Sequence, residues 1–154
     1  NVLIRNLNGN LDLDNFSGES NLEKSKGRFD IHQTTGAVKV TQSAGNLQFD
    51  IGRATMNSTL FSGRVEGQSQ EGAVSISMTS NSEVNVRAQM GRVTIQTVPG
   101  VALNLHTQGG EIFGPKYLSL QREGNAKSLK GRLQGQMNKG NVYVRTQEGA
   151  IIIK

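Results

Sequence analysis

The chain has 154 residues, of which 34% are hydrophobic and 5% aromatic, and it carries a formal net charge of +5 without any cysteine or tryptophan. This composition is lean for a globular core and ordinary for a repeat protein with a thin core. It excludes a disulfide framework and a cysteine-based metal site, and no apolar run is long enough to predict a transmembrane segment.

A short phrase recurs along the chain: glycine, any residue, an apolar residue, any residue, an apolar residue. The chain begins with Asn1 rather than Met and the pattern is already running at Val2, so we expect a fragment of a longer protein. Most glycine-to-glycine steps are nine residues or a multiple of nine. The complete copies of the phrase begin at Gly9, Gly27, Gly36, Gly45, Gly72, Gly91, Gly140 and Gly149.

Alternation of apolar and polar residues over four or five positions predicts half-buried strands of about five residues, each preceded by a glycine turn. An antiparallel meander would use tight hairpins, but Asn8-Gly9 is the one typical hairpin dipeptide. The fixed period instead favours an all-β, single-stranded parallel β-helix, or β-solenoid. Two phrases would make an 18-residue coil and three a 27-residue coil. By their position in the apolar–polar alternation, Val40 and Val93 point into the core.

The nine-residue period slips between residues 100 and 131, a segment that holds both long gaps of the pattern. We interpret it as coils that carry a loop at about 113–130. Such a loop is either functional or a tolerated insertion. The chain is thus one solenoid domain over 1–154.

The last coil ends in three consecutive isoleucines, and parity turns Ile152 outward. An outward isoleucine suggests a neighbouring domain, a continuation of the chain or a self-association surface. A solenoid also exposes unpaired strands at its ends, where copies of the chain could associate.

Two stretches, GRVTIQTVPGVALNLHTQGGEI (91–112) and GNVYVRTQEGAIIIK (140–154), resemble the adhesin-like β-solenoid domains of bacterial cell-envelope proteins, a family mostly of unknown function. The resemblance implies an exported protein of the cell envelope or cell surface, without an established active site. The chain departs from the family by placing arginine, not an acid, after several glycines. The matching residues of the second stretch are Val144, Arg145, Thr146, Gly149, Ile151 and Ile153.

The sequence shows no catalytic, cofactor-binding or metal-binding constellation. His32 and His106 are isolated and each follows an inward residue, so we expect both on the surface. The aspartates lie on or beside strands rather than in the turns, unlike those of calcium-binding rolls. A polysaccharide-cleaving β-helix would need clustered acids and aromatic platforms. We therefore predict that the chain is not an enzyme and uses no cofactor.

Charge divides the chain into an acidic and a basic part. Residues 1–83 have a net charge of −2 and residues 84–154 of +7. A basic line on a solenoid could hold an anionic glycan or another envelope polymer, whereas nucleic acid is not expected because base-stacking aromatic residues are few. Tyr117 and Tyr143 are the candidates for sugar stacking. The basic candidates are Arg92, Lys130, Arg132 and Lys139.

The sequence therefore predicts a non-catalytic binding domain, adhesin-like, of the cell envelope or surface. The first alternative is a structural scaffold that polymerises end to end, as the bactofilin cytoskeletal solenoids do. A carbohydrate-active β-helix enzyme is the second alternative.

Overall fold

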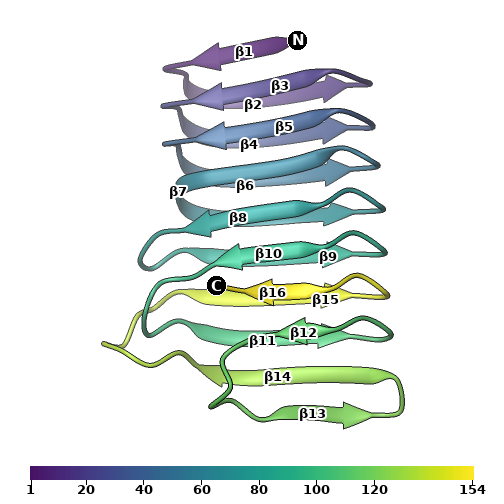
Figure 1. Ribbon diagram of the computed structural model, residues 1–154. Coiled ribbons are helices and arrows are strands. Elements are labelled where there is room, and N and C mark those ends of the chain that lie inside the picture. Colours follow the sequence, from purple (N-terminus) through teal and green to yellow (C-terminus); the bar gives the residue numbers. More distant parts are fainter.

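The computed structural model describes all 154 residues, and its regular structure consists of strands without any helix (Figure 1). The strands in chain order are β1 (Val2–Arg5), β2 (Asn8–Asn15), β3 (Glu19–Glu23), β4 (Lys26–Gln33), β5 (Ala37–Thr41), β6 (Ala44–Ile51), β7 (Thr55–Ser69), β8 (Val74–Met78), β9 (Glu83–Ala88), β10 (Val93–Gln96), β11 (Ala102–Thr107), β12 (Ile112–Phe113), β13 (Leu120–Glu123), β14 (Ala126–Arg132), β15 (Asn141–Thr146) and β16 (Ile151–Ile153).

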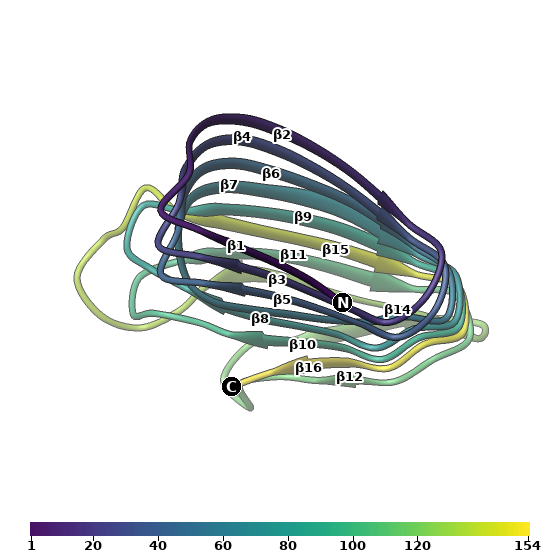
Figure 2. The same cartoon turned by 90° about the horizontal axis from the view of Figure 1, so that it is seen from above.

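The strands wind into a β-solenoid in which each coil contributes one strand to each of two facing sheets (Figure 2). Sheet A stacks β1, β3, β5, the first half of β7, β8, β10, β16 and β12 in that order, all parallel. Sheet B stacks β2, β4, β6, the second half of β7, β9, β15, β11, β14 and β13. The predicted solenoid is confirmed, and its first coils repeat every 18 residues, the smaller of the two sizes.

The core is a stack of inward ladders between the two sheets. One ladder of sheet B joins Phe29, Leu47, Val65 and Val84 through successive strand pairs. In sheet A, Val40 and Val93 are fully buried, as the parity predicted. Each such side chain stabilises the fold by about 1.5–3 kcal/mol relative to exposure. Because a single coil is too thin to enclose these residues, the stacking of neighbouring coils creates the core.

In the coils up to β9 the corner from sheet A to sheet B is built without glycine, contrary to the prediction of a glycine at every turn, whereas Gly100, with a φ of +80°, lies at the later corner between β10 and β11. One residue per coil adopts a left-handed backbone there, and a buried serine, Ser25, Ser43 or Ser82, follows it in three coils. The Ser25 Oγ accepts a hydrogen bond from the Leu7 N–H at 3.0 Å, and the Ser43 Oγ accepts one from the Ser25 N–H at 3.1 Å. These serines satisfy backbone groups that a bare corner would leave unpaired. The left-handed corner residues of the first coils are Asn6, Lys24, Gln42 and Leu60.

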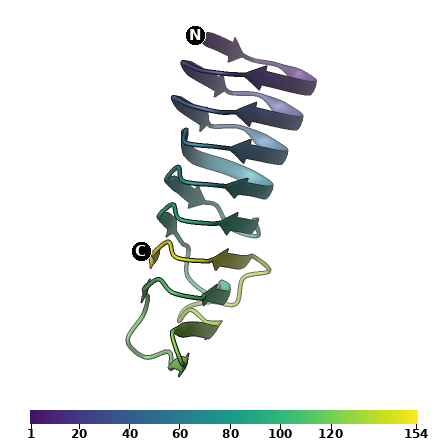
Figure 3. The same cartoon turned by 90° about the vertical axis from the view of Figure 1, so that its right-hand side faces the viewer.

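The coils do not stack in chain order. After β10 the chain passes over one level before it forms β11, and the last coil, β15 and β16, later fills the level left open. Figures 1 and 3 show these yellow C-terminal strands between the teal and green ones. Val142 therefore lies between Val84 and Leu103 in sheet B. The sequence analysis did not predict this inserted coil.

The insertion also places the three terminal isoleucines inside the stack, on β16 between β10 and β12 of sheet A. Ile151 is buried, whereas Ile152 points outward and is half-buried between Thr94 and Phe113 on the adjacent strands. The outward direction expected for Ile152 is confirmed.

The segment around 113–130, predicted as a loop, instead contains an antiparallel hairpin. β14 pairs with β11 in antiparallel register, Leu105 opposite Leu129, and β13 pairs with β14 outside it. Lys127 fastens the hairpin to the coil above, since its Nζ donates to the Gly110 carbonyl at 3.0 Å and pairs with the Glu111 carboxylate. The hairpin caps this end of the solenoid with a short, charged edge strand, a feature that discourages edge-to-edge association.

One polar atom inside the core lacks a partner. Ser58 lies between Val40 and Ile76 in the inward ladder of sheet A, is 1% exposed, and its Oγ makes no hydrogen bond. A buried unpaired hydroxyl costs about 1–3 kcal/mol. We expect Ser58→Ala to raise the free energy of unfolding by about 1 kcal/mol in chemical denaturation.

The matched control for this variant is Ser69→Ala. Ser69 is also buried, but its Oγ donates to the Gly72 carbonyl at 2.6 Å. Ser69→Ala should therefore lower the stability. Equal destabilisation by both variants would contradict the cost assigned to Ser58.

Candidate binding surface

The outward face of sheet B carries columns of polar side chains, because alternate residues of each strand point away from the core and the strands are in register. The column nearest the strand ends changes from acidic to basic along the solenoid axis. Its members, in stacking order, are Asp14, His32, Asp50, Gln68, Arg87, Arg145, His106 and Ser128.

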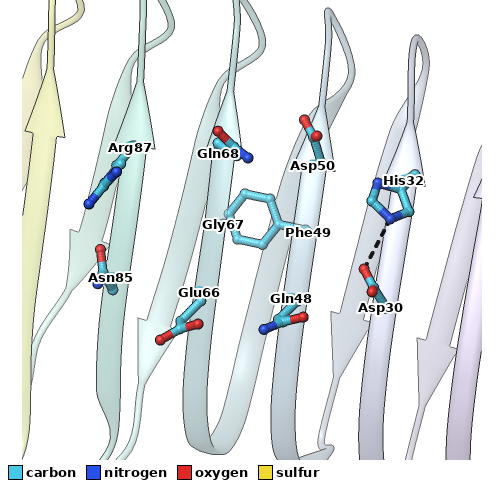
Figure 4. Close-up of a pocket in the computed structure, with 10 residues that line it drawn as sticks. All are labelled: Asp30, His32, Gln48, Phe49, Asp50, Glu66, Gly67, Gln68, Asn85 and Arg87. Carbon is cyan, nitrogen blue, oxygen red and sulfur yellow. Dashed lines mark ion pairs between the residues drawn. The ribbon is translucent and has the colours of Figure 1, made fainter.

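Two hollows of similar volume lie along this face, before a smaller one beside the hairpin, and the first is mainly acidic. The acidic hollow has a volume of about 420 Å³, and Asp30, Asp50 and Glu66 contribute carboxylates to its lining (Figure 4). The His32 Nε2 lies 3.2 Å from the Asp30 Oδ1. No group of three or more His, Cys, Asp or Glu side chains is placed to hold a metal ion.

Gly67 lies at the centre of the acidic hollow, at an inward position that pairs with Phe49. A Cβ atom at residue 67 would lie 2.3 Å from the Phe49 Cε1. The ring therefore fills the space that a side chain of residue 67 would need, as Figure 4 shows. The floor of this hollow is packed core rather than an opening into the interior.

The second hollow, which we call the basic groove, continues the first toward the capped end. Its volume is also about 420 Å³, and it shares Asp50, Gln68 and Arg87 with the acidic hollow. Arg145 joins Arg87 from the next strand. Ala88 is the one apolar residue that lines it.

A turn repeated in four coils forms one wall of the basic groove. Each turn reads Ser, Thr or Ala, then Gln, any residue and Gly, and where the first residue is Ser or Thr its buried hydroxyl forms a hydrogen bond within the turn. For example, the Thr146 Oγ1 donates to the Gly149 carbonyl at 2.7 Å. The backbone N–H of each Gln donates to a backbone carbonyl of the coil above. These bonds stack the turns in register. The exposed members of this glutamine ladder are, in stacking order, Gln70, Gln89, Gln147 and Gln108.

Elsewhere on the surface, some charges on adjacent coils are paired with opposite charges. Arg5 contacts Glu23 at 2.8 Å and Arg53 contacts Glu71 at 2.9 Å, each across one coil step. A hydrogen bond from Lys39 lowers the pKa of Glu19 from its ordinary value. A hydrogen bond from Lys127 likewise lowers the pKa of Glu111. Complementary pairing between coils thus occurs at several positions, mainly in residues 1–83.

Arg87 and Arg145 instead form a like-charged facing pair, as Asp12 and Asp30 do near the other end of the same face. They are direct neighbours on parallel strands, which lie about 4.8 Å apart. Neither forms an ion pair. Like charges on directly facing positions destabilise a sheet. A local arrangement that costs stability is expected at a functional site.

The predicted basic residues do not form one patch. Lys130 and Arg132 lie on the outward face of sheet B, but the Arg132 Nη1 donates to the Gly100 and Asn138 carbonyls and holds the connection to the last coil. Arg92 lies in the turn that leads into sheet A. Lys139 lies in the connection between β14 and β15. A single line through Arg92 and Arg132 is therefore wrong, because the two belong to opposite ends of the strands.

The two tyrosines are also apart. Tyr143 points outward from β15, between Asn85 and Asn104. Tyr117 lies in the connection before β13, where its hydroxyl accepts a hydrogen bond from the Gln134 N–H at 3.0 Å. Tyr143 shares the face of the basic groove, whereas Tyr117 belongs to the capped end. His32 and His106 both lie on the outward face of sheet B, as expected.

Sequence reasoning missed Arg87 and the glutamine ladder, and it used Arg145 only as a match to the adhesin-like family. The sequence signal for the ladder was a Gln that recurs two residues before a turn glycine, at positions 70, 89, 108 and 147. The Arg87–Arg145 pair had no such signal, since it depends on the inserted coil.

No protein-family model, no curated protein and no solved structure matches this chain. The structure has no helix long and apolar enough to cross a membrane.

Proposed function

We propose that this chain is a non-catalytic binding domain of the bacterial cell envelope or cell surface that holds an anionic polymer. The observation that carries the proposal is the unneutralised positive charge of residues 84–154. Of the ten Lys and Arg residues there, Lys127 alone pairs with a carboxylate. In residues 1–83, four of seven do so.

The fold supports binding of an extended ligand. A solenoid repeats equivalent side chains along a straight axis, and charges of one sign along such a line attract a polymer of the opposite sign. The acidic residues at the other end of the same face would repel that polymer. Binding is therefore confined to the capped part of the solenoid.

Two surface carboxylates are neutralised by lysine partners of the same chain. The displaced carboxyl pKa values, those of Glu19 and Glu111, are lowered by lysine partners on the surface. The envelope location rests on the resemblance to adhesin-like domains and stays a prediction.

The test measures co-sedimentation of the protein with polygalacturonate, dextran sulfate and neutral dextran over a salt series. We expect salt-sensitive binding to the two polyanions and none to dextran, since counterions screen exposed charges. Reversal of Arg87, Lys130 and Arg145 to Glu should weaken binding at least about tenfold.

The matched control replaces Lys24, Lys26 and Arg28 by Glu. These residues are exposed and form no ion pair, and their replacement changes the net charge by the same amount. This control should bind nearly as well as the wild type. Equal losses in both triple variants would reduce the effect to net charge and contradict the proposal. Pelleting of the protein without polymer would point instead to a self-assembling scaffold.

A further inference from the structure

We propose that the basic groove is a site for a carboxylated polysaccharide of the uronate type, whose chain runs along the solenoid axis. The inference rests on the proposed function and specifies its site and ligand class. Arg87 and Arg145 pair with carboxylates of the sugar chain, and the glutamine ladder binds its hydroxyl groups.

The first argument is the unused hydrogen-bonding capacity of the groove. The side chains of Arg87, Arg145 and the glutamine ladder form no hydrogen bond with another part of the protein. They converge on one groove from four stacked levels. All their donors and acceptors thus remain available to a ligand.

The second argument concerns the charge of the ligand. Two guanidinium groups on adjacent strands repel each other until an anion lies between them. The planar guanidinium fork matches a carboxylate in bidentate geometry. Asp50 is the one acid in the lining, and it lies at the end of the groove toward the acidic hollow. Its carboxylate repels an anion, which therefore binds on the Arg145 side.

The third argument concerns the neutral part of the ligand. Primary amides donate and accept hydrogen bonds, as sugar hydroxyls do. Four glutamines repeat at the strand spacing of about 4.8 Å, which suits a chain of repeated polar units. Since Ala88 is the one apolar lining residue, the groove offers nothing to a lipid chain, and without aromatic residues it offers no stacking for nucleobases.

The site exists because of the inserted coil. Arg145 and Gln147 come from the last coil, which lies between the levels of Arg87 and His106. If the coils stacked in chain order, the level of β11 would follow that of β9 directly, and His106 would replace Arg145 beside Arg87. The paired guanidinium groups are thus a product of the insertion.

The experiment measures binding of the full chain to a linear oligogalacturonate and to the same oligomer with its carboxylates methyl-esterified. Dextran sulfate and inorganic polyphosphate serve as alternative polyanions. The test variant is Arg87→Gln with Arg145→Gln. The control is Arg92→Gln with Lys154→Gln, which removes the same charge from exposed residues outside the groove. Thermal unfolding checks that each variant folds.

We expect the test variant to weaken oligogalacturonate binding about tenfold or more and the control to stay within about twofold of the wild type. The esterified oligomer should not bind. Gln89→Ala with Gln147→Ala should weaken binding of oligogalacturonate but leave dextran sulfate unchanged, because hydroxyl recognition is lost while the charge remains.

Equal weakening in the test and control variants would overturn the assigned site but leave polymer binding intact. Tighter binding of polyphosphate or dextran sulfate than of oligogalacturonate in this groove would overturn the ligand class. Absence of binding to every polyanion would refute the proposed function itself, and the site with it.

Discussion

Val93→Asp is expected to abolish the folded state. Val93 is fully buried and lies between Val74 and Ile151 on the two adjacent strands of sheet A. A carboxylate there has no cation or donor within the apolar ladder, so it either loses its hydration or becomes protonated. We expect a loss of about 4 kcal/mol or more, a large part of the stability of a domain of this size. Circular dichroism during urea titration measures it.

Position 93 also joins the inserted coil to the first part of the chain, because β16 pairs with β10 there. The damage should therefore extend beyond one coil. The control is Gln96→Asp on the same strand, where the residue is exposed and points outward. A Val93→Asp protein that melts like the control would refute the inward ladder.

Gly45→Ala has the second large expected effect. Gly45 has a φ of +119°, in the region that residues with a side chain rarely adopt. A Cβ atom there would lie 2.0 Å from the carbonyl oxygen of Gly27 on the adjacent strand. Since the neighbour is backbone, it cannot move away without breaking the ladder between β4 and β6. We expect a loss of about 3 kcal/mol or more in the free energy of unfolding.

The control for this substitution is Gly109→Ala. Gly109 lies in an exposed turn with a backbone outside the left-handed region, and its nearest neighbouring atom would be 3.6 Å from the new Cβ. This variant should unfold within about 0.5 kcal/mol of the wild type. If Gly45→Ala were equally mild, close backbone approach would not explain the recurring glycine.

The strands and their inward residues could be predicted from the sequence because two local rules produce them. Alternation identified the buried side of β5 and β10, and the glycine period identified where coils begin. The left-handed corners escaped prediction because Lys24, Gln42 and Leu60 carry no local signal for that conformation. Contacts with the adjacent coil, such as those of Ser25, hold them there.

The stacking order could not be predicted either, because all copies of the phrase resemble one another. By its sequence, Val84 could pair with an apolar residue of β11 or of β15. In the complete fold its partner is Val142 of β15. The candidate site shares this limit. Its glutamines recur in the sequence, but the contact of Arg87 with Arg145 follows from the stacking order alone.

The inserted coil changes how unfolding can spread through the molecule. In an array whose repeats contact their chain neighbours, partial unfolding proceeds from the outer repeats. Here β15 and β16 are the strands that pair with both the coil of β9 and β10 and that of β11 and β12, and these two coils form no strand pair with each other. Release of this one level separates the upper coils from the capped lower part. Cooperative unfolding of the whole stack thus depends on the segment 141–154, although this segment is at the C-terminal end of the sequence.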